Sequence, residues 1–262
     1  MRKIIRLVIL SAILIVATLI HGCGITSSGE VLTVKKDFAN FTYVDVSSSF
    51  DFEITRSDTF NVVIEVDESL ADYVEVSQLG QILKIYLKPH HIFTDFTLGA
   101  KTLKAEITMP ALYGLQVSGA SKGTITGFKG LGNFEAVVSG ASSLEMIDIE
   151  TSNINLEVSG ASKVKGNTTA GNSKFEVSGA SRVELSGSTT AITLLVSGAS
   201  KADLTDFLLN NADVELSGAS EATVNVKERL DIIVSGASRL YFLGNPTMGN
   251  VEVTGASTVK HK

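Results

Sequence analysis

The amino-acid sequence predicts an all-β protein, a right-handed parallel β-helix with rungs of about 18–21 residues, preceded by an N-terminal signal helix. A repeated tetrapeptide and the even spacing of the apolar residues around it support this prediction. The tetrapeptide Ser-Gly-Ala-Ser, varied to Thr-Gly-Ala-Ser in its last copy, begins at Ser118, Ser139, Ser159, Ser178, Ser197, Ser217, Ser235 and Thr254. Eight copies at a nearly constant interval predict a solenoid in which each copy marks one turn.

The residues that flank each tetrapeptide predict strands on both sides of it. The residue just before every copy is Val or Leu, and the residue two positions earlier is apolar throughout. The residues five and seven positions after the first residue of each copy are mostly apolar. These even separations have the period of a strand. Each rung is therefore predicted as strand, corner, strand and a polar third side such as residues 186–190, and the preferred handedness of parallel crossovers gives the right-handed winding.

The composition of the tetrapeptide suits a corner of this fold. Glycine adopts backbone angles that turn the chain, and Ala and Ser are small enough to stack at a strand spacing of about 4.8 Å. Serine hydroxyls can also bond along the stack or to nearby backbone groups. An ordered hydroxyl array that binds sugar or ice is the functional alternative. The structural interpretation is favoured, because the fold itself requires these residues at this corner.

The region before the repeats alternates in the same way with larger apolar residues, and Val46-Ser-Ser-Ser-Phe50 resembles a degenerate corner. No Pro/Gly linker separates this region from the repeats. We therefore expect one β-helix domain over residues 31–262. Residues 31–117 would form irregular N-terminal rungs that cap the core, and residues 118–262 would form the Ser-Gly-Ala-Ser repeat rungs.

The N-terminal residues predict export. Arg2, Lys3 and Arg6 precede an uncharged, mostly aliphatic run from Leu7 to Ile20, which is too short for a membrane span and typical of a signal peptide. Gly22-Cys23 follows and resembles a lipobox, although His21 is unusual there. We predict a lipoprotein-type signal peptide over residues 1–22, lipidation of Cys23, and a flexible spacer over residues 23–30. An uncleaved anchor and ordinary secretion are the alternatives, and the preferred location is a membrane-anchored lipoprotein of the cell envelope.

Several ordered motifs resemble a known family. They are Val44-Asp-Val-Ser47, Phe50-Asp-Phe-Glu-Ile-Thr55, Val66-Asp-Glu-Ser-Leu70 with Tyr73-Val-Glu-Val76, Gly80-Gln-Ile-Leu-Lys-Ile85 and the repeated Val-Ser-Gly-Ala-Ser. Together they resemble the putative auto-transporter adhesin, head GIN domain family, over nearly the whole mature chain. Ser48 stands where members of that family usually have Gly, which affects only the geometry of the first corner. The resemblance implies an exported β-helical protein named for adhesion, without catalytic residues to carry over.

Composition and motifs exclude several classes of function. A single Cys excludes a disulfide scaffold and a cysteine-based zinc site, and a net charge of −6 argues against a nucleic-acid partner. No phosphate-binding loop or nucleophilic triad can be assembled, so no cofactor is implied. The irregular segment from Lys88 to Lys104 contains His90, His91 and Asp95. A loop whose Phe rings fill the end of the core is favoured there over a metal site.

The leading functional hypothesis is a non-catalytic surface protein, an adhesin or ligand-binding scaffold for a glycan or a protein. The alternative is a structural, self-assembling envelope protein, in which the exposed strand edges of the C-terminal rung pair with a second copy. A third and less favoured hypothesis is a polysaccharide-active enzyme. It rests on Glu157 and Glu176, which occupy equivalent positions in consecutive rungs at about the spacing that retaining glycosidases use.

One outward column is rich in cations. The position four residues after the first residue of each tetrapeptide is basic in five of eight copies: Lys122, Lys163, Arg182, Lys201 and Arg239. This column, the basic stripe, predicts a track for an anionic partner such as an acidic polysaccharide or lipid headgroups. The alternative is that it protects the sheets from aggregation, with Glu184 and Asp203 supplying counter-charge.

Overall fold

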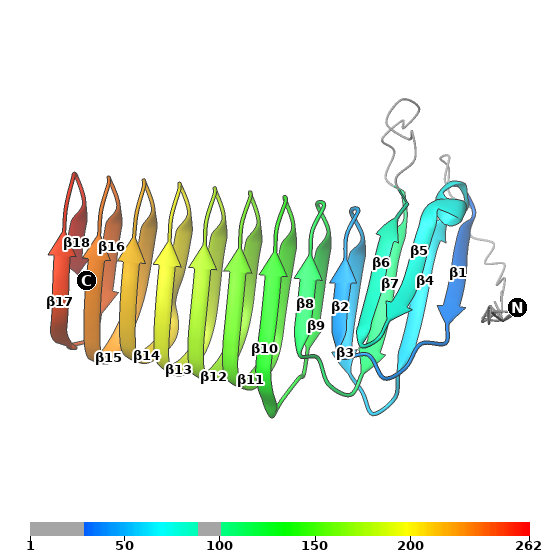
Figure 1. The fold of residues 1–262 in the computed structure, drawn as a ribbon, viewed down its shortest axis with the longest axis horizontal. Helices are drawn as coiled ribbons and strands as arrows, with labels where there is room; N and C mark the ends of the chain where they lie inside the picture. Colours follow the sequence, from blue (N-terminus) through cyan, green and yellow to red (C-terminus); the bar gives the residue numbers. More distant parts are fainter. Residues whose placement is uncertain (1–28, 89–100) are drawn as a thin grey trace, which may run out of the picture.

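The computed structural model describes residues 29–88 and 101–262. They form a nearly all-β structure that contains a parallel β-solenoid of about seven turns, as the sequence predicts (Figure 1). The predicted signal helix, Cys23 and most of the spacer lie outside the described residues, as does the segment with His90, His91 and Asp95. Within the described part of the chain, no helix is long and apolar enough to cross a membrane.

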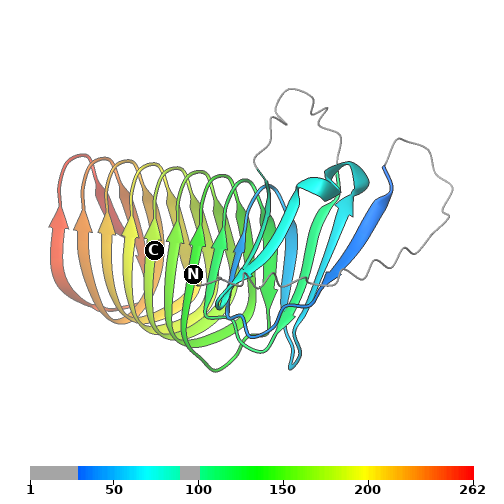
Figure 2. The same cartoon turned by 45° about the vertical axis from the view of Figure 1, so that its right-hand side comes forward.

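The regular part of the solenoid contains eleven strands. They are β8 (Gly114–Val117), β9 (Lys122–Thr126), β10 (Leu131–Val138), β11 (Ser143–Val158), β12 (Lys163–Val177), β13 (Arg182–Val196), β14 (Lys201–Leu216), β15 (Glu221–Val234), β16 (Arg239–Leu243), β17 (Thr247–Val253) and β18 (Thr258–His261). The long strands β11–β15 bend, so that one strand serves both faces of a rung (Figures 1 and 2). Their first halves pair in a back sheet with β9, β16 and β18, and their second halves pair in a front sheet with β8, β10 and β17.

Strand pairing confirms the register that the tetrapeptides predict. Each rung pairs in parallel with the next, so that Val158 lies beside Val177 and Leu156 beside Phe175. The inward columns of the front sheet are buried as far as β15, with Phe175 and Val196 at most 1% exposed. Alternation therefore directs one set of side chains into a continuous core.

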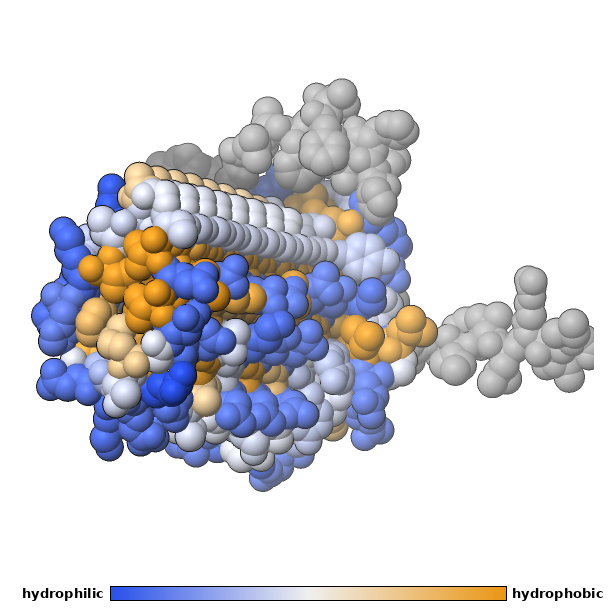
Figure 3. Space-filling view, turned by 60° about the vertical axis from the view of Figure 1, so that its left-hand side comes forward, coloured by the Kyte–Doolittle hydropathy of each residue, from blue (hydrophilic) through white to orange (hydrophobic). Residues whose placement is uncertain are grey.

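The corner residues stack as closely as their size allows. Gly179 has a φ of +77°, and a Cβ added to it would lie 2.4 Å from the carbonyl oxygen of Gly160 in the preceding rung. The amide of Ala180 donates to that same oxygen at 2.8 Å. Figure 3 shows the result as a straight, evenly spaced ridge of small residues along one edge of the solenoid.

The second serine of each corner points inward. These serines are Ser121, Ser142, Ser162, Ser181, Ser200, Ser220 and Ser238, and each is at most 2% exposed. Several bond along the stack: the amide of Ser181 donates to Oγ of Ser200 at 3.3 Å, and Oγ of Ser220 donates to Oγ of Ser238 at 3.3 Å. The predicted structural role of these hydroxyls is thereby supported, because most of this buried column is joined by hydrogen bonds.

The third side of each rung differs from the expected polar connection. In β13 it is continuous strand, with Gly187 beside Phe207 of β14. Phe207 and Leu209 are fully buried, and the buried hydroxyl of Thr189 donates to the carbonyl of Gly171 at 3.1 Å. The sequence predicts a polar third side such as residues 186–190, and in the structure alternation sends the polar Thr189 of this stretch inward, where a neighbouring carbonyl satisfies it.

The N-terminal section is more varied than a stack of widened rungs. It contains β1 (Val31–Lys36), β2 (Tyr43–Val46), β3 (Asp51–Arg56), β4 (Asn61–Asp67), the 3-10 helix η1 (Glu68–Tyr73), β5 (Val74–Leu79), β6 (Ile82–Leu87) and β7 (Leu103–Met109). Strand β2 pairs in parallel with β6 and β8, and β3 with β7 and β9, which continues the two sheets. In contrast, β5 is antiparallel to β6, and β4 is antiparallel to β7 and β1. The end of the core is therefore closed by antiparallel strands (Figure 2).

The degenerate corner that the sequence predicts at residues 46–50 is present. Ser48 and Ser49 have φ values of 68° and 63°, close to those of the first regular corner. The amide of Ser49 donates to the carbonyl of Gly119 at 2.9 Å, which stacks the two corners. Serine in place of glycine at position 48 thus leaves this corner in the left-handed conformation at some steric cost.

Candidate ligand-binding groove

Two outward columns of the front sheet border a groove that runs along the solenoid. The first column holds Asn133, Asn153, Asn172, Ala191, Asn211 and Arg229 in successive rungs. The second column holds Tyr43, Gly114, Glu135, Asn155, Lys174, Thr193, Asp213 and Asp231. Five rung steps separate Glu135 from Asp231, which corresponds to about 24 Å at the usual strand spacing.

The groove consists of two adjoining hollows. The larger has a volume of about 770 Å³ and extends from Tyr43 and Tyr113 to Lys174. The smaller has a volume of about 290 Å³, extends to Asp231 and shares Asn172 and Ser173 with the larger. We call the two together the amide groove. The inward residues between the two columns, such as the buried Phe134 and Ile154, lie at its floor and fix its depth.

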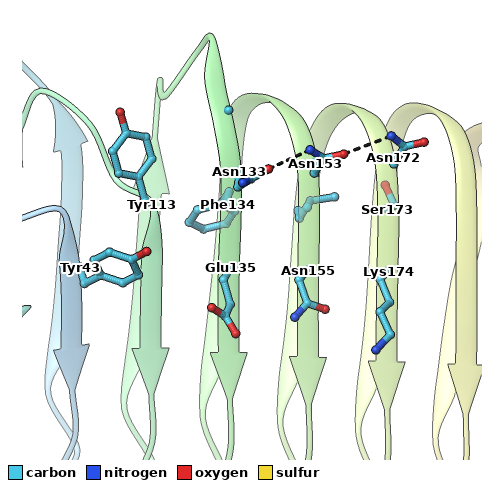
Figure 4. A pocket seen from close by; sticks show the side chains of 12 residues that line it. Tyr43, Tyr113, Asn133, Phe134, Glu135, Asn153, Asn155, Asn172, Ser173 and Lys174 are labelled. Atoms are coloured by element: carbon cyan, nitrogen blue, oxygen red, sulfur yellow. Dashed lines mark hydrogen bonds between the residues drawn. The ribbon is translucent and has the colours of Figure 1, made fainter.

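Three asparagines form a hydrogen-bonded ladder on one wall of the amide groove (Figure 4). The Nδ2 group of Asn153 donates to Oδ1 of Asn133 at 2.8 Å, and that of Asn172 donates to Oδ1 of Asn153 at 3.1 Å. Each carboxamide has two N–H donors and an oxygen with two lone pairs, so the ladder uses only part of this capacity. The ladder therefore orients the amides while leaving donors and acceptors for a ligand.

An unpaired acceptor lies on the opposite wall. Oδ1 of Asn155 is buried and has no hydrogen-bond partner among the described residues. Asn155 lies between Glu135 and Lys174 in the second column (Figure 4). A buried acceptor without a partner costs stability, and a rotation of the Asn155 side chain toward the groove would let a ligand supply the missing donor.

Two tyrosines form the end of the amide groove near the N-terminal section. Tyr43 and Tyr113 are 39% and 40% exposed, and both rings lie at the same end of the larger hollow (Figure 4). The ring of Tyr43 extends over the neighbouring Gly114, where an added Cβ would lie 2.1 Å from Cδ1 of that ring. Glycine at position 114 therefore leaves the space that this ring occupies.

The charges of the amide groove largely compensate one another. Nζ of Lys174 lies 2.6 Å from Oε1 of Glu176, which raises the pKa of Lys174 through the hydrogen bond and the opposite charge. Nε of Arg229 lies 2.6 Å from Oδ2 of Asp231. This hydrogen bond, assisted by the backbone amide of Asn250, lowers the pKa of Asp231. Glu135 is exposed and has no ion pair within the described residues, so no net positive charge is available for a polyanion.

The basic stripe is in register but is not a row of free cations. Lys122, Lys163, Arg182, Lys201 and Arg239 share one outward column of the back sheet with Ser143 and Glu221. Nζ of Lys163 lies 2.9 Å from Glu184, whose carboxylate also pairs with Arg182, and Nζ of Lys201 lies 2.6 Å from Glu221.

The hydrogen bond from Lys163, aided by that from Arg182, lowers the pKa of Glu184. Glu184 therefore supplies counter-charge as the alternative interpretation requires, although Lys163 and Arg182 share this one carboxylate.

The carboxylate pair considered for catalysis is adjacent but lies on an open face. Glu157 and Glu176 are register neighbours in the front sheet, and Glu176 binds Lys174. Neither residue lines the amide groove. Among the described residues, no group of three His, Cys, Asp or Glu side chains could hold a metal ion.

The tetrapeptides alone do not indicate the amide groove. Its signal is present in the sequence, since Asn recurs six residues before the first serine at Asn133, Asn153, Asn172 and Asn211. The two tyrosines belong to segments outside the regular repeat, and only the fold brings them to the same hollow. Sequence periodicity could thus have found the asparagines but not the aromatic end.

Fold and site together define a parallel β-solenoid with a lengthwise polar groove on its front sheet. The chain belongs to the family described as putative auto-transporter adhesin, head GIN domain, whose model matches residues 40–246. Membership indicates an adhesin-like protein of the cell surface or exterior. No curated protein matches the chain.

Solved structures share the fold at low sequence identity. A putative adhesin from Parabacteroides merdae has a TM-score of 0.78 at 16% identity, over 89% of this chain and 97% of that chain. A putative lipid binding protein from Parabacteroides distasonis has a TM-score of 0.75 at 20% identity, over 89% and 97%. A putative adhesin from the same organism has a TM-score of 0.74 at 18% identity, over 89% and 98%. At these identities the likeness establishes the fold alone.

Proposed function

We propose that the protein is a non-catalytic binding protein of the cell envelope, which presents the amide groove to a ligand outside the cell. The observation that supports this most is the groove itself, because it combines oriented amides, an unpaired acceptor and exposed aromatic rings on a rigid face. Ligand sites typically combine apolar surface with a few convergent polar groups. The adhesin family of the chain supports the same function.

The non-catalytic part of the proposal rests on the local chemistry. The adjacent carboxylates Glu157 and Glu176 lie on an exposed face, and Glu176 is held by Lys174. A glycosidase pair needs one protonated carboxylic acid and walls that exclude water. We expect no release of reducing sugar from polysaccharides incubated with the full chain, and turnover of any of them would contradict the proposal.

Membrane attachment through a lipid at Cys23 is the second part of the proposal. It is supported by the basic residues, the apolar run and the Gly-Cys pair at the N-terminus. Globomycin should make the wild-type chain accumulate as a precursor, and Cys23→Ser should leave the same precursor with or without globomycin. A wild-type chain whose size does not change with globomycin would refute lipidation and leave an uncleaved anchor or ordinary secretion as the explanation.

Binding itself is tested with the full chain purified in detergent and applied to immobilised cell-surface extracts. The expected result is saturable retention that a Tyr43→Ala variant loses. A matched control is Tyr241→Ala, which removes a tyrosine from the back sheet. Retention lost equally in both variants, or absent in the wild type, would contradict the proposed function.

Self-association is a second candidate function, favoured by the exposed apolar residues of β17. Met248, Val251 and Val253 are 41%, 46% and 44% exposed, whereas the register neighbours Ile232 and Val234 of the preceding rung are buried. Figure 3 shows apolar residues gathered at this end of the solenoid. Exposed edges of this kind pair with other strands, and a two-fold dimer would close the contact. Cross-linking of the full chain in detergent should give a dimer, and a purely monomeric product would count against this candidate.

A further inference from the structure

We infer that the amide groove binds a linear, uncharged glycan, with one sugar ring packed against Tyr43 and Tyr113 and hydroxyl groups bound by the asparagines. This inference rests on the proposed function and names the ligand class of the same site. It is carried by three features of the groove: its periodicity, its hydrogen-bonding groups and its aromatic end.

The periodicity of the amide groove fits a polymer. Successive rungs place equivalent side chains about 4.8 Å apart, and this spacing is held by parallel pairing over the whole groove. The ladder of Asn133, Asn153 and Asn172 repeats the same amide in three consecutive rungs. A straight row of identical groups on a rigid sheet offers repeated contacts only to an extended ligand that itself repeats.

The hydrogen-bonding groups of the groove fit hydroxyls. Amides of the ladder present both donors and acceptors, and a hydroxyl is the ligand group that also does both. Oδ1 of Asn155, buried and unpaired within the described residues, requires a donor, which a hydroxyl supplies and a phosphate or carboxylate does not. Lys174 and Arg229 are already paired with carboxylates, so no cation of the groove is left for an acidic sugar.

A peptide ligand fits less well. The floor of the groove is a sheet whose strands β10, β11 and β12 are paired on both sides, so its backbone groups are used within the solenoid. Strand addition needs an open edge with free N–H and C=O groups, which this face does not offer. Contacts must therefore come from side chains, and these are amides, hydroxyls, phenol rings and the carboxylates of Glu135 and Asp213, which form no ion pair within the described residues.

The aromatic end supplies the apolar part of a sugar site. Rings of Tyr43 and Tyr113 expose apolar faces together with polar hydroxyls. The C–H face of a pyranose ring is apolar while its rim carries hydroxyls, so it matches this combination. Gly114 leaves space for the ring of Tyr43. Substituting Gly114→Ala therefore displaces this ring without removing any ligand-binding group. This property provides the sharpest test.

The test uses the full chain in detergent on an array of linear neutral hexasaccharides of glucose, xylose and mannose, with oligogalacturonate as the acidic comparator. We expect binding of at least one neutral glycan, unchanged at raised salt. Affinity should fall about tenfold or more in Tyr43→Ala and in Gly114→Ala, consistent with loss of an aromatic anchor, and should be retained in Tyr43→Phe. Asn153→Ala should weaken binding, whereas Tyr241→Ala should not, and thermal unfolding verifies that each variant is folded.

Distinct results overturn the inference and the proposed function. Neutral-glycan binding that is equal in Tyr43→Ala, Gly114→Ala and Asn153→Ala would overturn the assignment to the groove. Binding of oligogalacturonate that is lost at raised salt or in a Lys163/Arg182/Lys201→Ser triple variant would assign the ligand to the basic stripe instead. A further outcome is that the protein is retained on cell-surface extracts in a Tyr43-dependent way yet binds no glycan of the array. That result would overturn the assignment of a glycan ligand and leave the proposed binding function standing.

Discussion

Replacing Gly179 by Ala should destabilise the solenoid by more than the conformational cost of an alanine at this position, because the new methyl group also clashes with the neighbouring rung. Gly179 belongs to a corner, has a φ of +77° and faces the carbonyl oxygen of Gly160 at 2.4 Å from an added Cβ. That oxygen accepts the amide of Ala180 at 2.8 Å. The new methyl group would have to push two rungs apart, because the three nearest atoms that it meets all belong to the backbone of Gly160.

The size of the effect follows from three contributions. A left-handed backbone conformation costs a residue with a Cβ about 1–2 kcal/mol. Weakening the rung-to-rung hydrogen bond costs about 1 kcal/mol, and the reduced entropy of the unfolded chain returns about 0.4–1 kcal/mol. We therefore expect Gly179→Ala to lower the free energy of unfolding by about 1–3 kcal/mol, before any cost of displacing the neighbouring rung is added.

Gly130 provides the matched control. Its φ of +70° is nearly the same, but nothing lies within 4 Å of an added Cβ. Gly130→Ala therefore carries the conformational cost without the steric one. Urea unfolding followed by circular dichroism should give a lower midpoint for Gly179→Ala than for Gly130→Ala. Equal midpoints would refute the claim that close backbone stacking at the corner fixes the rung spacing.

Three further predictions concern charge, core and edge. Because Lys163 lowers the pKa of Glu184, the contribution of this carboxylate is present at neutral pH and is lost as pH falls below about 4. The urea midpoint of the Glu184→Gln variant should thus fall less on acidification than that of the wild type. Identical pH profiles for the two proteins would contradict the pairing of Glu184 with Lys163. Phe207→Ala should lower the free energy of unfolding by about 3–5 kcal/mol because the ring is fully buried. Leu208→Ala should change the stability little because that side chain is 43% exposed. Similar melting temperatures for the two variants would be inconsistent with this difference in burial. Val253→Lys should decrease cross-linked dimer, and an unchanged dimer yield would exclude β17 as the contact.

The regular rungs could be predicted from sequence because their constraints are local and repeated. Each corner needs a glycine at a positive φ, a small exposed residue and a small buried residue, and the flanking strands need inward apolar residues at even spacing. All of these are visible as columns once the tetrapeptides are aligned. The predicted register, for example Lys163 beside Arg182, agrees with the structure for this reason.

The N-terminal section could be predicted only as strands. Alternation indicates which residues are extended, but the direction of pairing depends on turns that the repeat does not specify. At Gly80, with a φ of 59°, the chain reverses between β5 and β6 and makes that pair antiparallel. Parallel rungs and antiparallel hairpins produce the same alternation of apolar residues, so the pattern could not distinguish them.

The basic stripe is visible in the sequence and the amide groove as a whole is not, for a related reason. Composition counts made the five cations of the basic stripe conspicuous, but counting does not reveal that Glu184 lies between Lys163 and Arg182. The groove, by contrast, depends on neutral residues and on Tyr43, which reaches its column through pairing with a rung more than sixty residues later in the sequence. Such contacts follow from topology rather than from any local motif.

A crystal structure of the chain with a bound neutral oligosaccharide tests the central claim most directly. We expect the sugar to lie along the amide groove, with one ring against Tyr43 and Tyr113 and hydroxyls within hydrogen-bond distance of Asn153 and of Oδ1 of Asn155. Sugar found instead on the basic stripe, or along the ridge of corner residues, with the amide groove empty would contradict it.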